Sequence, residues 1–421
     1  MSLFAANRNF RLLFSATAVS NLGDGISALA FPWLATLITR DPLLIAAVAA
    51  ATRLPWLLFS LPAGVITDRM DRRRLMVGTD VLRMILTVGV IGLILNAPPM
   101  PLADNAAHAL PLIIGLCSAA FLLGSAEVVR DNAAQTALPS VVDDRDLERA
   151  NGQLWSIEQI MGQFIGPPVA GLLIALAVPA PFLVDAATFG IAAFLIWQIA
   201  MLPKVHVQQT HGFWQQMKEG ADWMRGHPLI LRLALMLGVL NFVTMMSATM
   251  LVLLSQEIMG LDAAGHGLLL TAGAAGGVLG GMFGPKLVAR CGAQACVIGS
   301  LALFPFPFII LALTSNPWIA GLALFLEMAG GMTWNVVTVS LRQRLIPDAL
   351  LGRVNSIYRF FGWGSIPLGA LFAGILVTTL EGSMGREAAL RVPYLFGAMV
   401  CVGLAVFGTA TLKLPNSGSG G

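Results

Sequence analysis

Long apolar stretches separated by short polar connections dominate the pattern of this chain. A helix that crosses the hydrocarbon core of a membrane needs about 20 mainly apolar residues. Twelve such stretches are present, at residues 11–38, 43–66, 75–96, 110–134, 151–177, 182–202, 229–256, 265–289, 295–314, 318–343, 354–378 and 392–413. They lack the regular alternation of a membrane β-barrel, so we predict an all-α membrane protein with twelve transmembrane helices.

The composition agrees with a chain that is solvated by lipid. Of its 421 residues 57% are hydrophobic and 11% are charged, and the mean hydropathy is +0.80. A soluble domain carries about 25% charged residues, so this class is excluded. The net charge of +3 includes no basic block of the kind that binds nucleic acid.

The distribution of Lys and Arg predicts the orientation of the helices. If the N-terminus is inside, only Arg40, Arg386 and Arg391 fall in outer connections, and the other basic residues outside the spans fall in inner ones. The positive-inside rule therefore places both termini in the cytoplasm. The first apolar stretch is too long for a signal-peptide core, so we expect it to remain as a span.

The longest polar connection divides the twelve spans into two sets of six. It covers residues 203–228 and contains an amphipathic helical pattern over 213–224. We therefore predict an N-terminal six-helix bundle over 1–202, a cytoplasmic linker over 203–228 and a C-terminal six-helix bundle over 229–414. Residues 415–421 have the composition of a flexible tail or an appended linker and are excluded from this division.

The two halves of the sequence resemble each other. Around the fifth span Leu-Pro, Arg-Ala-Asn and Gly-x-x-x-Ala-Gly occur in order, and the eleventh span is surrounded by Ile-Pro, Arg-Val-Asn and Gly-x-x-x-Ala-Gly. Asn21 in the first span and Asn241 in the seventh also hold corresponding positions. A parallel repeat of this kind is typical of transporters that alternate access to a site between their halves.

Two motifs resemble those of the major facilitator superfamily. The loop Gly64-Val-Ile-Thr-Asp68-Arg69-Met-Asp71-Arg72-Arg73-Arg74 is similar to the signature loop of the superfamily, and Asp71 replaces the usual glycine. Residues 162–171, Gly-Gln-Phe-Ile-Gly-Pro-Pro-Val-Ala-Gly, resemble the motif of its antiporters, and Ala170 replaces a glycine.

Further segments are similar to the macrolide-efflux and enterobactin-exporter branch of the drug:proton antiporters. They are residues 15–33, 126–132 and 147–152. The resemblance implies the major facilitator fold and export from the bacterial cytoplasm across the inner membrane, driven by proton entry. It implies a small-molecule substrate and protons as partners, with no cofactor and no metal, and we expect a monomer in the bilayer.

The signature loop suggests a conformational latch. The resemblance implies that Asp68 faces the N-terminus of the eleventh span, where a carboxylate gains about 0.3–1 kcal/mol from the helix dipole. The alternative is that these charges only fix topology. The residues assigned to the latch and its supporting ion pairs are Gly64, Asp68, Arg69, Arg72, Arg73, Asp80, Arg83, Arg130, Asp131 and Arg353.

The antiporter motif suggests a bent and closely packed fifth span. Small residues let another helix approach, and prolines remove backbone hydrogen bonds. Ordinary packing is the alternative reading. The residues of the motif are Gly162, Gly166, Pro167, Ala170 and Gly171.

Ionisable residues at membrane depth are expensive and are therefore candidates for function. Asp24 and Glu327 lie near the middle of their spans and are the candidates for carrying a proton, and Arg53 is within plausible reach of Asp24. Glu127 and Glu158 lie nearer the cytoplasm and come next. A buried polar contact that fixes helix register is the alternative role for each acid.

The substrate cavity is expected between the halves, on the first, fourth, seventh and tenth spans. Aromatic and Met side chains offer an adaptable apolar surface for varied ligands, although such residues more often serve packing alone. The candidates are Phe31, Trp33, Asn241, Met245, Met246, Trp334 and Asn335.

These features favour a proton-coupled exporter of amphipathic, drug-like molecules. A dedicated siderophore exporter is the first alternative, but an anionic siderophore would require several cationic groups in the cavity. A membrane receptor or scaffold is a second alternative, and no large signalling domain is present. The sequence has no Walker motif, nucleophile motif or metal-spaced cluster, so an enzyme is not expected.

Overall fold

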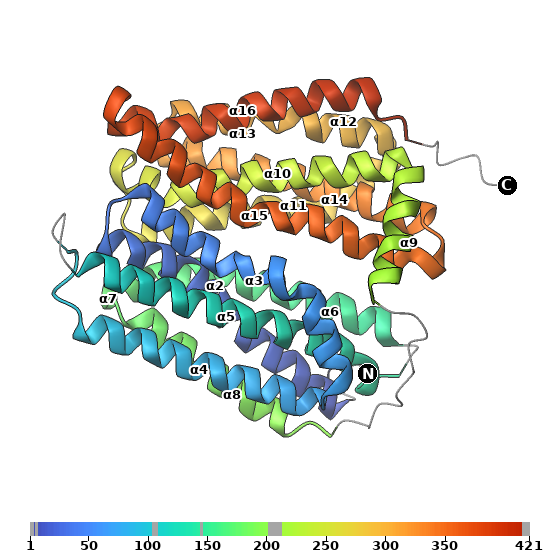
Figure 1. Cartoon of the computed structure of the whole chain (residues 1–421), viewed down its shortest axis with the longest axis horizontal. Coiled ribbons are helices and arrows are strands. Elements are labelled where there is room, and N and C mark those ends of the chain that lie inside the picture. Colours follow the sequence, from blue (N-terminus) through green and yellow to red (C-terminus); the bar gives the residue numbers. More distant parts are fainter. Residues whose placement is uncertain (1–3, 5–6, 103–107, 144–145, 201–212, 415–421) are drawn as a thin grey trace. The chain divides into compact units, whose positions relative to one another are not determined.

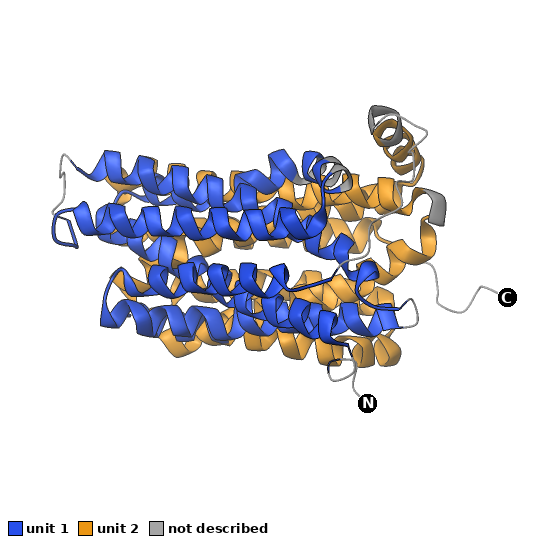
Figure 2. Ribbon diagram, turned by 90° about the horizontal axis from the view of Figure 1, so that it is seen from below, with its two compact units in different colours: residues 1–206, 261–271 blue, residues 207–260, 272–421 orange. Residues whose placement is uncertain are grey.

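Helices make up every regular element of the computed structural model, which describes residues 4, 7–102, 108–143, 146–200 and 213–414 (Figure 1). The chain forms two compact units (Figure 2). Unit 1 contains residues 1–206 and 261–271, and unit 2 contains 207–260 and 272–421. The tail 415–421 and the first part of the predicted linker lie outside the described residues.

Unit 1 consists of long helices interrupted by two short segments of different winding. In chain order these elements are α2 (Arg8–Ile38), α3 (Pro42–Arg69), α4 (Arg72–Asn96), α5 (Ala109–Ala137), the 3₁₀ turn η1 (Leu138–Ser140), α6 (Leu147–Gln159), the π-helix η3 (Ile160–Ile165), α7 (Gly166–Leu176) and α8 (Ala180–Trp197).

Unit 2 begins with a short helix in the predicted linker. Its elements are α9 (Phe213–Gly226), α10 (Pro228–Leu253), the π-helix η4 (Leu254–Ile258), α11 (Ala263–Cys291), α12 (Ala293–Leu303), α13 (Pro305–Leu313), α14 (Pro317–Leu345), α15 (Asp348–Met384) and α16 (Arg386–Thr411). The first residues of α11, up to 271, cluster with unit 1.

Eleven helical segments of the described chain are long and apolar enough to cross a membrane. The first helix, α2, is not among them although it has 31 residues. Polar residues in its middle, Asn21, Asp24 and Ser27, lower its hydropathy. The predicted count of twelve spans and the cytoplasmic location of both termini therefore remain predictions. The helix that would complete the count is α2, which carries Asp24.

Side chains at the helix N-termini explain several of the boundaries. Asp41 caps α3 by accepting a hydrogen bond from the Leu43 amide at 2.8 Å, and Pro42 begins the helix. Asp71 caps α4 in the same way through the Arg74 amide, also at 2.8 Å. The aspartate that departs from the superfamily loop therefore has a local role, because it starts α4.

Three of the predicted spans are not continuous α-helices. In the predicted span 229–256 the α-helix ends at Leu253 and the π-helix η4 follows it. The predicted span 151–177 consists of α6, η3 and α7, and its π-helix ends where Gly166-Pro167-Pro168 begins. Proline lacks an amide proton and clashes with the preceding turn, so the regular ladder cannot continue through this point. The predicted span 295–314 is divided at Phe304, immediately before Pro305.

Glycine contacts link the same pair of helices in each unit. A Cβ atom on Gly166 at the start of α7 would lie 2.5 Å from the Gly25 Cα of α2. A Cβ atom on Gly369 of α15 would lie 2.2 Å from the Phe242 carbonyl oxygen of α10. These are the first and fifth helices of each sequence repeat, so the recurring glycine has the same packing role in both halves.

Adding a methyl group at such a contact should destabilise the protein. We expect Gly369→Ala to lower the free energy of unfolding by about 1–3 kcal/mol, because the Phe242 backbone must move away. Gly403→Ala on α16 is the matched control, since its Cβ would meet nothing within 4 Å. Thermal unfolding of both purified variants in detergent is the measurement, and equal midpoints would contradict this packing argument.

Candidate functional site

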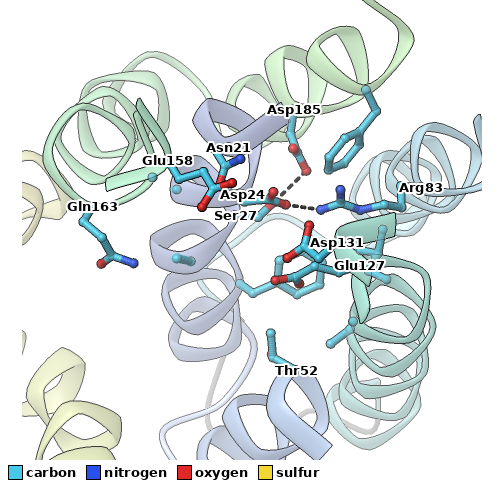
Figure 3. Close-up of a pocket in the computed structure, with 18 of the residues that line it drawn as sticks. Asn21, Asp24, Ser27, Thr52, Arg83, Glu127, Asp131, Glu158, Gln163 and Asp185 are labelled. Carbon is cyan, nitrogen blue, oxygen red and sulfur yellow. Dashed lines mark hydrogen bonds and ion pairs between the residues drawn. The ribbon is translucent and has the colours of Figure 1, made fainter. Parts of the chain in front are cut away.

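A polar cavity of about 180 Å³ lies within unit 1 (Figure 3). Side chains from α2, α3, α4, α5, α8 and the α6–η3 segment line it. Its titratable lining residues are Asp24, Arg53, Arg83, Glu127, Asp131, Glu158 and Asp185. An unusually large number of ionisable groups is thus gathered inside a bundle of apolar helices, which marks this place as the candidate site.

An ion pair joins Asp24 on α2 to Arg83 on α4 at the centre of the cavity (Figure 3). The Arg83 side chain is only 3% exposed, and its guanidinium group also lies 3.9 Å from the centre of the Phe189 ring. The sequence pointed to Arg53 as the neighbour of Asp24. Arg53 lines the same cavity, but the arginine that pairs with Asp24 is Arg83.

The ion pairs continue behind the cavity through a fully buried aspartate. Asp80 lies 3.8 Å from Arg83 and 3.4 Å from Arg130, and Arg130 lies 3.6 Å from Asp131. Both Asp80 oxygens are buried, and the two arginines hold this carboxylate by charge attraction. This chain begins at Asp24 and ends at Asp131, both in the cavity wall, and we refer to these five residues as the ion-pair chain.

This arrangement changes the interpretation of four residues. Asp80, Arg83, Arg130 and Asp131 were assigned from the sequence to a network that supports the cytoplasmic latch. The structure joins these four residues in ion pairs and connects them to Asp24, and their support of the latch stays a prediction because the Asp68 side chain lies outside the described residues. Arg83 lies eleven residues into α4, about 17 Å along the helix, which places it well inside the unit rather than at its end.

The glycines on either side of Asp24 are contact points with two other helices. A Cβ atom on Gly23 would lie 2.2 Å from the Thr188 Oγ1 and 2.4 Å from the Asp185 Oδ1, both on α8. A Cβ atom on Gly25 would lie 2.3 Å from the Gly162 carbonyl oxygen of η3. The Gly-Asp-Gly sequence therefore lets α2 approach α8 and η3 closely, so that Asp24 is held between them.

Asp185 is a functional candidate that the sequence analysis did not include among the site residues. Its carboxyl group is completely buried and its Oδ2 accepts a hydrogen bond from the Ser27 hydroxyl at 2.6 Å (Figure 3). The Thr87 hydroxyl lies 3.5 Å from the same oxygen. A charged residue within the otherwise apolar helix α8 is the sequence signal that could have identified it.

The other predicted proton candidates are divided between the units. Glu127 and Glu158 lie with Asp24 in the cavity wall. Glu327 is 3% exposed within unit 2, where Thr244 of α10 is its hydrogen-bonding neighbour and its Oε1 has no partner among the described residues. The position of an acid along its predicted span therefore did not distinguish Glu327, which is buried in unit 2, from the acids that line the cavity of unit 1.

The predicted substrate-binding residues also occupy different environments. Phe31 lines the cavity and packs edge-on against Phe182, with 5.5 Å between ring centres. Trp33 is buried with its ring 5.9 Å from the His266 ring. Asn241 donates a hydrogen bond to the Gly362 carbonyl at 2.8 Å and so joins α10 to α15. In unit 2, Met246 and Trp334 are buried, Met245 is half-buried and Asn335 is exposed.

Comparison with known proteins identifies the family. The model of the transmembrane secretion effector family, a major facilitator family, matches residues 2–416. The chain belongs to this family. It is 25% identical to the multidrug efflux pump Tap of Mycobacterium tuberculosis over 96% of this chain and 94% of Tap.

Two further similarities agree with this assignment. The enterobactin exporter EntS of Shigella boydii is 25% identical over 85% of this chain and 82% of its own. Among solved structures, the nucleoside transporter NupG has a TM-score of 0.71 at 13% identity and covers 97% of this chain and 100% of its own, which shows the fold alone. The protein is therefore a multi-pass membrane protein of a transporter family.

The superfamily loop of this chain belongs only in part to the described residues. The side chains of Gly64, Asp68 and Arg69 lie outside the described residues. Arg72 donates to the Ser140 hydroxyl at 3.0 Å, and Arg73 donates to the Ile199 carbonyl at 3.2 Å.

Arg353 was expected near Asp68, and within unit 2 it forms an ion pair with Glu219 of α9. Gly220 supports this contact, because a Cβ atom there would lie 3.1 Å from the Arg353 backbone. The linker helix is therefore attached to α15 of its own unit.

Removal of the buried Arg83 side chain should lower the free energy of unfolding far more than removal of an exposed arginine. Without Arg83, both Asp24 and Asp80 lose a partner in a dry environment, so we expect Arg83→Gln to destabilise unit 1 by about 3–5 kcal/mol. Arg225→Gln is the control, since the Arg225–Asp222 pair is largely exposed and contributes little. Thermal unfolding in detergent compares them, and similar midpoints would contradict the proposed importance of the ion-pair chain.

Proposed function

We propose that this protein exports amphipathic small molecules in exchange for protons. It works by alternating access as a twelve-span monomer in the bacterial cytoplasmic membrane, with both termini inside. The family and the two exporters among its relatives support transport out of the cell. The observation that carries the proposal is the acid-rich cavity of unit 1.

The charge of this cavity favours a cationic substrate. Two arginines, Arg53 and Arg83, face an excess of carboxyl groups, which belong to Asp24, Glu127, Asp131, Glu158 and Asp185. A cation that enters would neutralise part of this excess, whereas an anion would add to it. Phe31 and Phe189 in the same wall offer apolar contact for the rest of an amphipathic molecule.

Competition between the cation and protons for these acids provides the coupling. A buried carboxyl group is neutral when protonated and then attracts a cation poorly, whereas its ionised form binds the cation. Proton entry from outside would therefore release the substrate, and release of the proton inside would prepare the cavity for the next molecule. This requires that the acids reach water from each side in turn.

The latch remains part of this proposal. Asp68 at the end of α3 would interact with the N-terminus of α15 when the cavity is closed to the cytoplasm. The pairing of Arg353 with Glu219 leaves the amides of the first turn of α15 as the proposed partner of Asp68. The linker helix α9 would then follow the movement of α15.

The second candidate function is export of an anionic siderophore, which similarity to the enterobactin exporter favours. The excess of acids over arginines in the cavity argues against it. A receptor or scaffold without transport is favoured by no observation in the described residues.

Binding of two ions of the same shape tests the preference for cations. We expect the purified protein to bind tetraphenylphosphonium and to bind tetraphenylborate at least about tenfold more weakly, because only the sign of the charge differs. Glu127→Gln should weaken the cation about threefold to tenfold and leave the anion unchanged. Glu387→Gln, an exposed change in unit 2, is the control. Stronger binding of the anion would support the siderophore alternative.

Transport in inverted vesicles tests the coupling. An interior-acid pH gradient should drive accumulation of ethidium, and nigericin, which collapses the gradient, should abolish it. Vesicles that contain an unrelated membrane protein at equal density are the control. Accumulation that is the same in both vesicles, or that survives collapse of the gradient, would rule out proton-coupled export of this cation.

A further inference from the structure

Asp185 is the most completely buried acid of the cavity. Its Oδ2 receives the Ser27 hydroxyl at 2.6 Å, while its Oδ1 has no hydrogen-bond partner among the described residues. Both oxygens belong to a residue that lines the cavity. One oxygen is thus fixed by α2, and the other can carry a proton.

The charges that surround Asp185 come from two helices. The helices packed against α8 are α2, α4 and, over a smaller area, α7. The cavity-lining charges on α2 and α4 are Asp24 and Arg83, and α7 carries no titratable side chain. Arg83 is bound to Asp24, so the nearest cation is already neutralised by another carboxylate.

This difference separates the two acids chemically. Asp24 has a full ion-pair partner in Arg83. Asp185 has only hydroxyl donors and a second carboxylate nearby, and an ionised carboxylate without a cation is very costly in a dry interior. A protonated Asp185 avoids this cost and still accepts the Ser27 hydrogen bond.

The packing at Gly23 couples Asp185 to the movement of α2. The backbone of α2 lies so close to Asp185 that a Cβ atom on Gly23 would be 2.4 Å from its Oδ1. Ser27, which holds the other oxygen, belongs to the same helix. A small shift of α2 against α8 would therefore change both the hydrogen bond and the access of water to the carboxyl group.

We propose that Asp185 is the group that carries the exchanged proton, and that the Asp24–Arg83 pair stays ionised beside it. The proposal rests on the proposed function. When a cation enters the cavity, the Asp185 O–H bond breaks, its proton passes to cavity water, and the carboxylate that remains balances the charge of the cation. Proton return from the outer side reverses the step and releases the cation.

Glu327 provides a contrast that strengthens the assignment. It is also buried and has no ion-pair partner among the described residues, but its neighbours are side chains of the unit 2 core and it is not a residue of the unit 1 cavity wall. A carboxylic acid in that position can remain protonated throughout the cycle. Burial alone therefore does not select the carrier, whereas burial together with the cavity does.

Proton release on binding tests the assignment. Tetraphenylphosphonium is added to the purified protein in weakly buffered nanodiscs with a pH indicator, and we expect about one proton released per bound cation. Asp185→Asn should still bind the cation but release almost no proton. Glu327→Gln is the control, since it retains Asp185 and is not a residue of the cavity wall, and it should release the proton.

Infrared difference spectra provide a second readout that a purely structural role would not change. Addition of the cation should remove the band of a protonated carboxyl group in the wild-type protein. The band should be absent from the spectrum of Asp185→Asn, and it should shift in Ser27→Ala because that variant loses the hydrogen bond. This measurement keeps the test decisive if Asp185→Asn does not fold.

The outcomes separate this proposal from the one on which it rests. Undiminished proton release by Asp185→Asn, or a carboxyl band that is unchanged in Ser27→Ala, would overturn the role of Asp185 and leave proton-coupled export intact. Binding of the cation by the wild-type protein without any proton release, together with failure of gradient-driven ethidium accumulation, would instead overturn the proposed function itself.

Discussion

The need to neutralise charge away from water determines how unit 1 is built. Two buried guanidinium groups, of Arg83 and Arg130, are stable there only because carboxylates from α2, α4 and α5 surround them. Taking two opposite charges from water costs several kcal/mol per ion, and the cost is recovered only at close range. The ion-pair chain therefore fixes the register of these three helices. It contains three carboxylates and two arginines, and the carboxylates at its two ends, of Asp24 and Asp131, line the cavity.

Close helix packing provides the geometry that this chemistry needs. Asp24 can meet Arg83 because Gly23 and Gly25 bring α2 against α8 and η3. These two glycines act by removing the side chains that would hold the helices apart. The π-helix η3 ends at the Gly-Pro-Pro segment, so the antiporter motif contributes to the same contact through Gly162 and Gly166. Packing and charge are thus parts of one arrangement, since Asp24 lies between the two glycine contacts.

Much of this could be predicted from the sequence, and the failures have physical causes. Hydropathy located the helices, and the cost of burying charge selected Asp24, Glu127 and Glu158, all of which line the cavity. The partner of Asp24 could not be found in this way, because a long arginine side chain reaches across turns and helix depth does not reveal its direction. From the sequence, Asp71 could be recognised only as a departure from the superfamily motif. Its role as the N-cap of α4 follows from the hydrogen bond that it accepts from the Arg74 amide.

The internal repeat preserves packing in both halves while the chemistry differs. The alignment of Asn21 with Asn241 also aligns Asp24 with Thr244, since each lies three residues further on. In unit 1 the acid at this position meets an arginine beside a cavity, and in unit 2 the threonine meets the carboxyl group of Glu327 in a packed core. A threonine brings no charge, so unit 2 needs no arginine at this place. In the proposed mechanism both halves must move to alternate access, but binding and release of charge in one half is sufficient, because protonation of one site changes the electrostatic balance of the whole cycle.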